Sequence, residues 1–279
     1  MASTLPFEPR RFQSAAAHYL SGRPAYAPAL IDRVAQLCGL QPMHRVLDLG
    51  CGPGQLAIAF SPFVAEVVGV DPEPAMLRIA AERAAAASVP NARFIEGSSY
   101  DLRPQLGSFR LVTIGRAFHW MDRRRTLERL DSMIDPEGGA VVLFADRHPE
   151  LPDNAWRRVY QETLDRYAVG DTVRTQRKSP EWVPNMAVLL DSPFAELEQI
   201  SVIERRSTPV ERFVDRALSL SSTAPGRLGA AGADDLARDV RDVMAGYARD
   251  DGDGGGLAVV EVVASEALIA RRRGDAAPS

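Results

Sequence analysis

Three glycines and two aspartates form the pattern in this chain that best fits a ligand-binding site. An apolar run delivers Asp48, and Gly50, Gly52 and Gly54 follow at alternate positions in the segment VLDLGCGPG. Glycines let a backbone turn tightly and let a ligand lie directly against the main chain, because no Cβ stands in the way. Asp71 ends the next apolar run, 17 residues after Gly54. The pattern predicts a ligand-binding turn with an acidic partner.

The spacing of these residues narrows the class of ligand. Neighbouring parallel strands would place Gly52 and Asp71 at the same carboxyl edge of a sheet, where open α/β sheets bind ligands. A carboxylate there can accept hydrogen bonds from both hydroxyls of a ribose. A dinucleotide fingerprint needs a third glycine where Gln55 stands, and Pro53 removes a backbone N–H that would cradle a pyrophosphate. Asp48 would oppose a phosphate but favour an ammonium group, so a ligand with a ribose, a cation and no phosphate fits better than NAD.

Short apolar runs alternate with helical patterns from residue 44 onward. Strands that alternate with helices at this spacing predict βαβ crossovers and a mostly parallel sheet covered on both faces, so the fold class is α/β. Strands are expected at 45–49, 66–71, 91–96, 109–114 and 139–144, with helices at 54–60, 74–87 and 124–133. Further along, the patterns predict helices within 153–190 and at 210–221 and 234–248, and strands at 196–202 and 257–270.

Composition excludes several classes of protein. The 279 residues carry 33 Lys and Arg against 37 Asp and Glu, a formal charge of −4, which argues against a dedicated nucleic-acid binder. Cys38 and Cys51 are too few for a disulfide framework or a zinc site, and the acidic, glycine-rich run 249–256 lacks the spacing of a calcium loop, so no metal is expected. No signal sequence or apolar run of membrane-spanning length is visible, so we expect a cytoplasmic protein without a membrane partner; a homo-oligomer remains open.

The motifs resemble those of the class I S-adenosylmethionine-dependent methyltransferases. Asp48–Gly54 is similar to their D/E-x-G-x-G-x-G first motif, and Asp71 to the acid of the second motif, which holds the ribose. Phe94–Leu102 resembles the third motif, which contacts the adenine, although Ser98 stands where the family often has Asp. The resemblance implies a Rossmann-like sheet of seven strands, S-adenosylmethionine as cofactor and S-adenosylhomocysteine as product.

Two further segments resemble the trans-aconitate-type and UbiE-like small-molecule methyltransferases. Phe109–Asp122 is similar to their fourth-strand segment, which often carries a His-Trp pair, and Tyr19–Tyr26 to their N-terminal lead-in near the cofactor. The resemblance implies these cofactor-binding candidates: Asp48, Gly50, Cys51, Gly52, Gly54, Asp71, Pro72, Met76, Ser98, Ser99, Arg116, Arg23 and Tyr26. The substrate-binding candidates are Tyr19, His119, Trp120 and Trp156, and His119 is also a candidate base. For Met76 and Trp156, packing in the core is the competing interpretation.

The methyl group of a sulfonium is already activated, so the chain needs no triad or metal. Holding the reactants in line supplies much of the acceleration, and a base such as His119 matters only if the acceptor keeps its proton at neutral pH. The prediction is therefore methyl transfer to an O, N or C atom of a small molecule. Methylation of RNA or protein and a catalytically silent cofactor-binding scaffold are the alternatives, and Gly115–Phe118 does not match the Asn/Asp-Pro-Pro-aromatic motif of base N-methylation.

These assignments predict four segments along the chain. Residues 1–40 are predicted to form an N-terminal helical lid, 41–149 the cofactor-binding core, 150–195 a helical cap over the acceptor, and 196–279 the rest of the sheet with two helices. We expect segments 10–38 and 150–195 to lie over the carboxyl edge of the sheet and to enclose a mostly apolar pocket.

Overall fold

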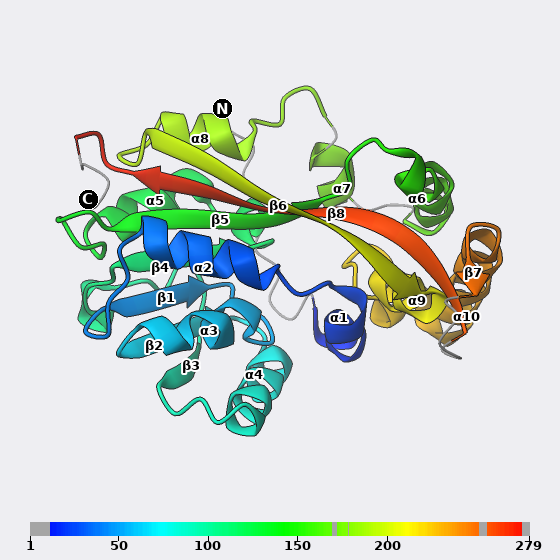
Figure 1. The fold of residues 1–279 in the computed structure, drawn as a ribbon, viewed down its shortest axis with the longest axis horizontal. Helices are drawn as coiled ribbons and strands as arrows, with labels where there is room; N and C mark the ends of the chain where they lie inside the picture. Colours follow the sequence, from blue (N-terminus) through cyan, green and yellow to red (C-terminus); the bar gives the residue numbers. More distant parts are fainter. Residues whose placement is uncertain (1–11, 169–171, 178, 251–255, 275–279) are drawn as a thin grey trace.

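The computed structural model describes residues 12–168, 172–177, 179–250 and 256–274. One sheet runs through the molecule in the order β3-β2-β1-β4-β5-β8-β6, with the short β7 paired to β8 (Figure 1). Its strands are β1 Arg45–Leu49, β2 Glu66–Asp71, β3 Ala92–Glu96, β4 Leu111–Gly115, β5 Ala140–Arg147, β6 Glu196–Pro209, β7 Arg249–Asp250 and β8 Leu257–Arg271. The first five strands pair in parallel, and β8 pairs antiparallel with both β5 and β6. The predicted α/β class is confirmed, and the seven predicted strands form this path with β7 as an eighth.

Helices cover both faces of the parallel half of the sheet. The α-helices of the described residues are α1 Ala16–Gly22, α2 Pro28–Leu37, α3 Gln55–Phe60, α4 Pro74–Ala86, α5 Arg123–Asp131, α6 Trp156–Tyr167, α7 Thr172–Arg177, α8 Asn185–Leu190, α9 Val210–Leu218 and α10 Pro225–Ala245, of which α6, α9 and α10 lie beyond the parallel half. Strand residues alternate between two cores: Val46 and Val67 pack with α2 and α3, whereas Leu47 and Val68 pack with α5 and α8. This period of two is the reason that a buried parallel strand reads as a continuous apolar run.

The antiparallel pair β6 and β8 is longer than its sequence patterns predicted. The predicted strand 196–202 extends to Pro209, because a strand at the edge of the sheet can hold charged residues such as Glu204 and Arg205 on half-exposed faces. Both long strands reach beyond the parallel half and carry the chain toward α6, α9 and α10 (Figure 1). These three helices pack on one another in a third apolar core, which also includes Val259 of β8.

Other helix boundaries differ from the prediction for local reasons. The described part of the predicted N-terminal helical segment begins with a 3-10 turn, Gln13–Ala15, which α1 follows directly. The helix expected at 234–248 begins earlier, at Pro225, and Gly229, with φ +70°, joins its two helical stretches across a kink. The glycine-rich run weighed as a calcium loop lies mostly outside the described residues. Within the described ranges, no helix is long and apolar enough to cross a membrane.

Candidate active site

A cleft lies at the carboxyl ends of the parallel strands and holds about 870 Å³ of empty space. Its walls come from the lid, the glycine turn, the end of β2, the loop after β3 and the end of β4. They are formed by Phe12, Tyr19, Leu49, Gly50, Gly52, Asp71, Pro72, Glu73, Met76, Gly97, Ser98, Ser99, Gly115, Arg116, Ala117, Trp120 and Met121. Part of this space is open to solvent, and most of its walls belong to the glycine turn and to loops at the ends of the strands.

The glycine turn between β1 and α3 adopts a backbone that only glycine accepts easily. Gly50, Gly52 and Gly54 have φ values of +71°, +50° and +75°. A Cβ on Gly50 would lie 2.6 Å from the Cβ of Ala117, so this position is closed by protein. A Cβ on Gly52 would meet nothing within 4 Å, because Gly52 faces the open cleft. The turn thus exposes bare main chain to a ligand, as the spacing predicted.

Asp71 joins the glycine turn to the end of β2. Its carboxylate accepts hydrogen bonds from the backbone N–H of Gly52 at 2.8 Å and of Glu73 at 2.9 Å. Burial raises the pKa of Asp71, and the amides of Glu73 and Gly52 oppose this effect by stabilising the ionised form. The side chain lines the cleft, so these bonds hold an oriented carboxylate at its wall.

The candidates for the adenine end come together on one wall. Met76 and Pro72 supply an apolar surface, and Ser98 and Ser99 a polar one. Asp101 fixes this loop, because its Oδ2 accepts from the backbone N–H of Ser98 at 2.8 Å and from its hydroxyl at 2.7 Å. These bonds lower the pKa of Asp101. Sequence reasoning missed Asp101, although an acid three residues after a serine is a common loop signal.

Asp48 does not line this cleft, contrary to the expectation that it would face the cation of the ligand. Its carboxylate is buried and accepts from the backbone N–H of Ala57 in the first turn of α3 at 3.0 Å and from the hydroxyl of Thr113 at 2.9 Å. Cys51 and Gly54 likewise lie outside the cleft wall: the Cys51 thiol is buried, and Gly54 begins α3 as its N-cap. These three residues therefore lie in or beside the turn but do not face the cleft.

Burial raises the pKa of Asp48 to about 7, which has a consequence for stability. Because the folded protein holds this proton more tightly than the unfolded chain does, the contribution of Asp48 to stability is largest below pH 4 and falls as pH rises to about 7. We expect Asp48→Asn to gain stability relative to the parent protein across this interval. Urea unfolding of both proteins at pH 4.5, 6 and 8 measures the difference, and a difference that does not change with pH would contradict the assignment.

A second, larger cavity adjoins the cleft and holds about 1540 Å³ of empty space, part of it open to solvent. The two share Phe12, Tyr19, Arg116, Ala117 and Trp120. Its other walls come from Arg23, Ile114, Phe118, His119, Leu143, Phe144, Ala145, Asp146, Gln161, Arg177, Trp182, Asn185, Leu220, Ser221 and Ser222. At the boundary, the rings of Phe12 and Trp120 meet edge to face with centroids 5.5 Å apart. Of the predicted His-Trp pair, Trp120 therefore lines both spaces and His119 lines the larger one.

Arg116 is held in an unusual backbone conformation at the end of β4. Its φ of +55° costs free energy for a non-glycine residue, and such strain is concentrated at functional sites. The guanidinium pairs with Asp146, donates to the carbonyl of Pro24 at 2.8 Å, and lies over the ring of Tyr26, 4.4 Å from its centroid. Arg116 lines both the cleft and the cavity, and it ties the lid to the sheet.

Two lid residues that were predicted to bind the cofactor, Tyr26 and Arg23, do not line the cleft. Tyr26 is buried against Phe144 and Arg116, because its ring fills the space beside β5, and it does not line the cleft. Arg23 lines the larger cavity and donates from Nε to the hydroxyl of Ser219 at 3.1 Å. Tyr19, predicted for the substrate, lines both spaces.

Trp156 was predicted to contact the substrate, and this prediction is wrong. Its side chain is 2% exposed and packs edge to face on Phe213 and Tyr160, with centroids 4.9 and 5.7 Å away. It belongs to the apolar core that joins α6, α9 and α10. The competing interpretation, aromatic packing in the core, is confirmed.

Several residues that line the cleft or the larger cavity were not predicted from the sequence. Glu73 lines the cleft and accepts from the backbone N–H of Phe12 at 3.1 Å, which joins the lid to the loop after β2. Leu220, Ser221 and Ser222 extend the larger cavity from the C-terminal half of the chain. Nothing local marks these positions, because they reach the site only through the packing of α9 beside the lid.

The arrangement is shared with known proteins. A family model described as a methyltransferase domain matches residues 46–138. An uncharacterized methyltransferase of Mycobacterium tuberculosis is 31% identical over 170 residues, 61% of this chain and 64% of that protein, so the chain spans just under two thirds of its length. Trans-aconitate 2-methyltransferase of Deinococcus radiodurans is 35% identical over 132 residues, 46% of each chain. The solved structure of an S-adenosylmethionine-dependent methyltransferase from Thiobacillus denitrificans, in complex with S-adenosylhomocysteine, has the same fold, with a TM-score of 0.52, 15% identity and coverage of 97% of this chain and 100% of that one.

The glycine turn, the acid at the end of β2 and the matched domain all lie in one and the same part of the sheet. Residues 46–138, which include this turn and this acid, therefore form a methyltransferase domain.

Proposed function

We propose that the protein transfers the methyl group of S-adenosylmethionine to a small-molecule acceptor. The observation that carries this proposal is the pair of adjoining spaces: a cleft at the glycine turn and Asp71, and a larger cavity that shares five wall residues with it. The related protein named trans-aconitate 2-methyltransferase supports an acceptor of this size class.

The residues of the cleft suit each part of the cofactor. Asp71 would accept from the two ribose hydroxyls, Met76 would cover one face of the adenine, and Ser98 and Ser99 would contact its edge. Gly50 and Gly52 line the cleft and would lie along the aminoacyl part, and at Gly52 the space that a Cβ would occupy is open to the cofactor. When bound, the cofactor supplies an already activated methyl group, so the chain has to align the reactants and exclude water.

The larger cavity favours a flat acceptor with a polar or negatively charged group. Phe12, Trp120 and Trp182 supply aromatic walls. Arg23 lies on the same wall, and among the residues that the structure describes it donates only through Nε, so its other guanidinium N–H groups are available to an acceptor. A cavity bounded by lid, sheet and C-terminal helices favours a small molecule over an RNA duplex or a folded protein domain.

His119 is proposed to orient or deprotonate the acceptor. It lies on the 3-10 helix Phe118–Trp120, on the wall of the larger cavity, with its ring 4.6 Å from that of Trp120. If it acts as a base, His119→Ala lowers kcat by about a hundredfold and removes the rise of kcat with pH near neutrality. If His119 only contacts the acceptor, KM rises and the pH profile keeps its shape; an unchanged kcat at every pH excludes the base.

Calorimetry and turnover test the proposal in sequence. Titration with S-adenosylhomocysteine is expected to release or absorb heat at one site per chain, whereas NADH is expected to give none. Incubation with methyl-labelled S-adenosylmethionine and a panel of small acids, phenols and amines then identifies the acceptor by transfer of label. Binding of NADH alone would indicate an oxidoreductase, and cofactor binding without transfer to any small molecule, RNA or protein would indicate a silent scaffold.

A further inference from the structure

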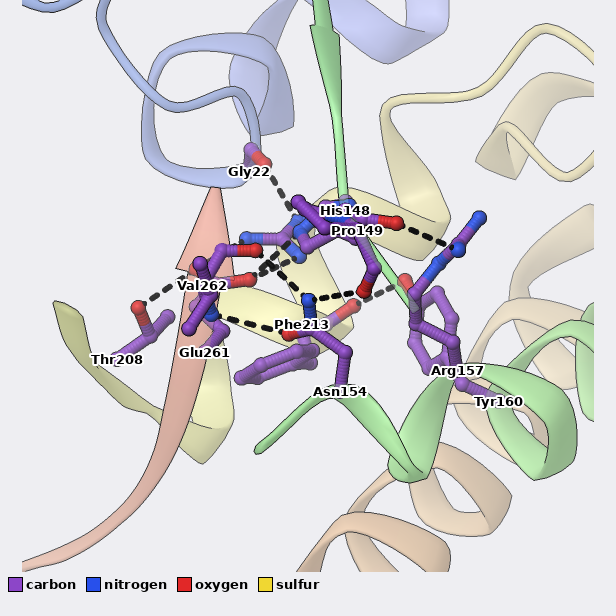
Figure 2. Close-up of polar contacts among 11 residues, drawn as sticks. Gly22, His148, Pro149, Asn154, Arg157, Tyr160, Thr208, Phe213, Glu261 and Val262 are labelled. Atoms are coloured by element: carbon purple, nitrogen blue, oxygen red, sulfur yellow. Dashed lines mark hydrogen bonds and ion pairs between the residues drawn. The ribbon is translucent and has the colours of Figure 1, made fainter. Parts of the chain in front are cut away.

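A buried group of charged side chains lies outside both spaces of the active site. Glu261 of β8 is 1% exposed, and four polar atoms surround its carboxylate (Figure 2). The Thr208 hydroxyl donates to it at 2.7 Å, and Nε2 of His148 lies 2.9 Å away. The guanidinium of Arg216 binds both carboxylate oxygens, at 2.9 and 3.0 Å. Burial alone would raise the pKa of Glu261, but the bonds from His148 and Arg216 hold it well below its usual range, so the carboxylate stays ionised.

The other side of Arg216 reaches the lid. Its Nε donates at 3.3 Å to the carbonyl of Gly22, the last residue of α1 (Figure 2). A Cβ on Gly22 would lie only 2.4 Å from the backbone carbonyl carbon of Asp215, so α1 ends directly against the backbone of α9. One guanidinium therefore connects β8, α9 and α1.

Two more bonds join the same pair of helices. Nδ1 of His18 lies 2.7 Å from the carboxylate of Asp215, and Arg23 donates to Ser219 at the end of α9. Helix α1 carries Tyr19, which lines both the cofactor cleft and the acceptor cavity. The position of α9 thus sets the position of a wall that the two spaces share.

A hollow with about 720 Å³ of empty space, part of it open to solvent, adjoins the turn after α1. It is lined by Ser21, Gly22, Pro24 and Ala25 and by residues of β6 and α9. Arg216 and Glu261 lie on its wall, beside Thr208 and Arg212. Beside this hollow, the bond from Arg216 to Gly22 adds a polar restraint to the end of α1, which also packs against the backbone of α9.

We propose that Glu261 and Arg216 are positioning residues for methyl transfer: they orient α9 and, through Gly22, hold α1 and Tyr19 in place over the cofactor. A buried ion pair contributes little net stability because desolvation offsets its attraction, so fixing one arrangement is the role that such a pair can serve. The inference rests on the proposed function, since it gives the lid a task in that reaction.

The test compares two glutamates that each bind an arginine guanidinium through two hydrogen bonds, as a fork. Glu261 of β8 binds Arg216 of α9, and Glu211 of α9 binds Arg241 of α10. Glu261→Gln weakens the buried fork, whereas Glu211→Gln weakens an exposed one, in which Arg241 binds Glu211 at 2.7 and 2.8 Å. Hydrogen exchange is measured on the peptide that spans 12–27 and on one that spans β1 and α3, and S-adenosylhomocysteine binding is measured by calorimetry. For Glu261→Gln we expect exchange in 12–27 to accelerate about tenfold and the Kd to rise about tenfold, with β1 and α3 unchanged. Glu211→Gln is expected to match the parent protein in all three.

Equal behaviour of the two variants, or acceleration of exchange throughout the chain in Glu261→Gln, would overturn the proposal, because the pair would then have no specific effect on the lid. If Glu261→Gln does not fold, Arg216→Lys takes its place, since lysine keeps the charge but cannot reach Glu261 and Gly22 together. Arg216→Lys is then expected to give the same local exchange and the same loss of affinity, and parent-like values would overturn the proposal. Failure of the parent protein to bind S-adenosylhomocysteine would instead contradict the proposed function.

Discussion

Asp71→Ala is expected to weaken S-adenosylhomocysteine binding by about a hundredfold or more. The carboxylate stands at the cleft with its orientation fixed by the N–H groups of Gly52 and Glu73. Hydrogen bonds to a charged group contribute about 1.5–3 kcal/mol each, and the proposed site loses two of them to the ribose hydroxyls. A loss of roughly 3 kcal/mol corresponds to about a hundredfold in Kd, which calorimetry measures directly.

Glu66→Gln is the matched control for this variant. Glu66 is an acid at the other end of β2, where it pairs with Arg45 and Arg93 far along the strand from the cleft. We expect its affinity for S-adenosylhomocysteine to equal that of the parent protein. An Asp71→Ala protein that folds, as judged by circular dichroism, and binds as tightly as Glu66→Gln would rule out the ribose assignment.

Gly52→Ala is expected to lower kcat/KM by about a hundredfold, although the empty protein has room for the new methyl group. A Cβ at Gly52 meets no atom within 4 Å, because that space is the cleft itself. The methyl group would therefore displace the cofactor, and a misplacement on the order of 1 Å costs about a hundredfold in rate. The measurement is kcat/KM for the methyl donor with the acceptor that the panel identifies, together with the Kd for S-adenosylhomocysteine.

Gly52→Ala would also strain the backbone, so the effect of strain has to be measured apart from the steric effect. Gly229→Ala is the control for strain. Gly229 also has a positive φ, +70°, and a Cβ there also meets nothing within 4 Å, but it lies in α10 rather than at the cleft. Alanine at either position should cost about 1–3 kcal/mol of unfolding free energy, because at Gly229 the φ of +70° comes with a ψ of 169°, which residues other than glycine rarely adopt. Only Gly52→Ala should lose activity; an equal loss in Gly229→Ala would mean that strain, not occupation of the cleft, explains the effect.

The parts of the fold and site that could be predicted have local signals. Strand β2 and helix α4 follow from apolar runs and a proline at the first turn, and Gly52 and Asp71 from the motif in which they stand. The same reasoning placed Asp48 at the ligand, but its position at the base of the turn directs it to the backbone of α3 and to Thr113. A motif defines which residues recur together, whereas the direction of each side chain depends on the elements packed against it.

The α/β class, the alternation of strands and helices along the chain, the glycine turn and the acid at the end of β2 could all be predicted without a structure. These features depend on periodicity and on residues close together in the chain, which one stretch of sequence contains in full. Three other features became visible only in the folded protein: Trp156 belongs to a core, Leu220–Ser222 line the larger cavity, and Glu261 reaches the lid through Arg216. Each of these depends on contacts between residues that are distant in sequence, and such contacts form only when long strands such as β6 and β8 bring the C-terminal helices beside the N-terminal lid.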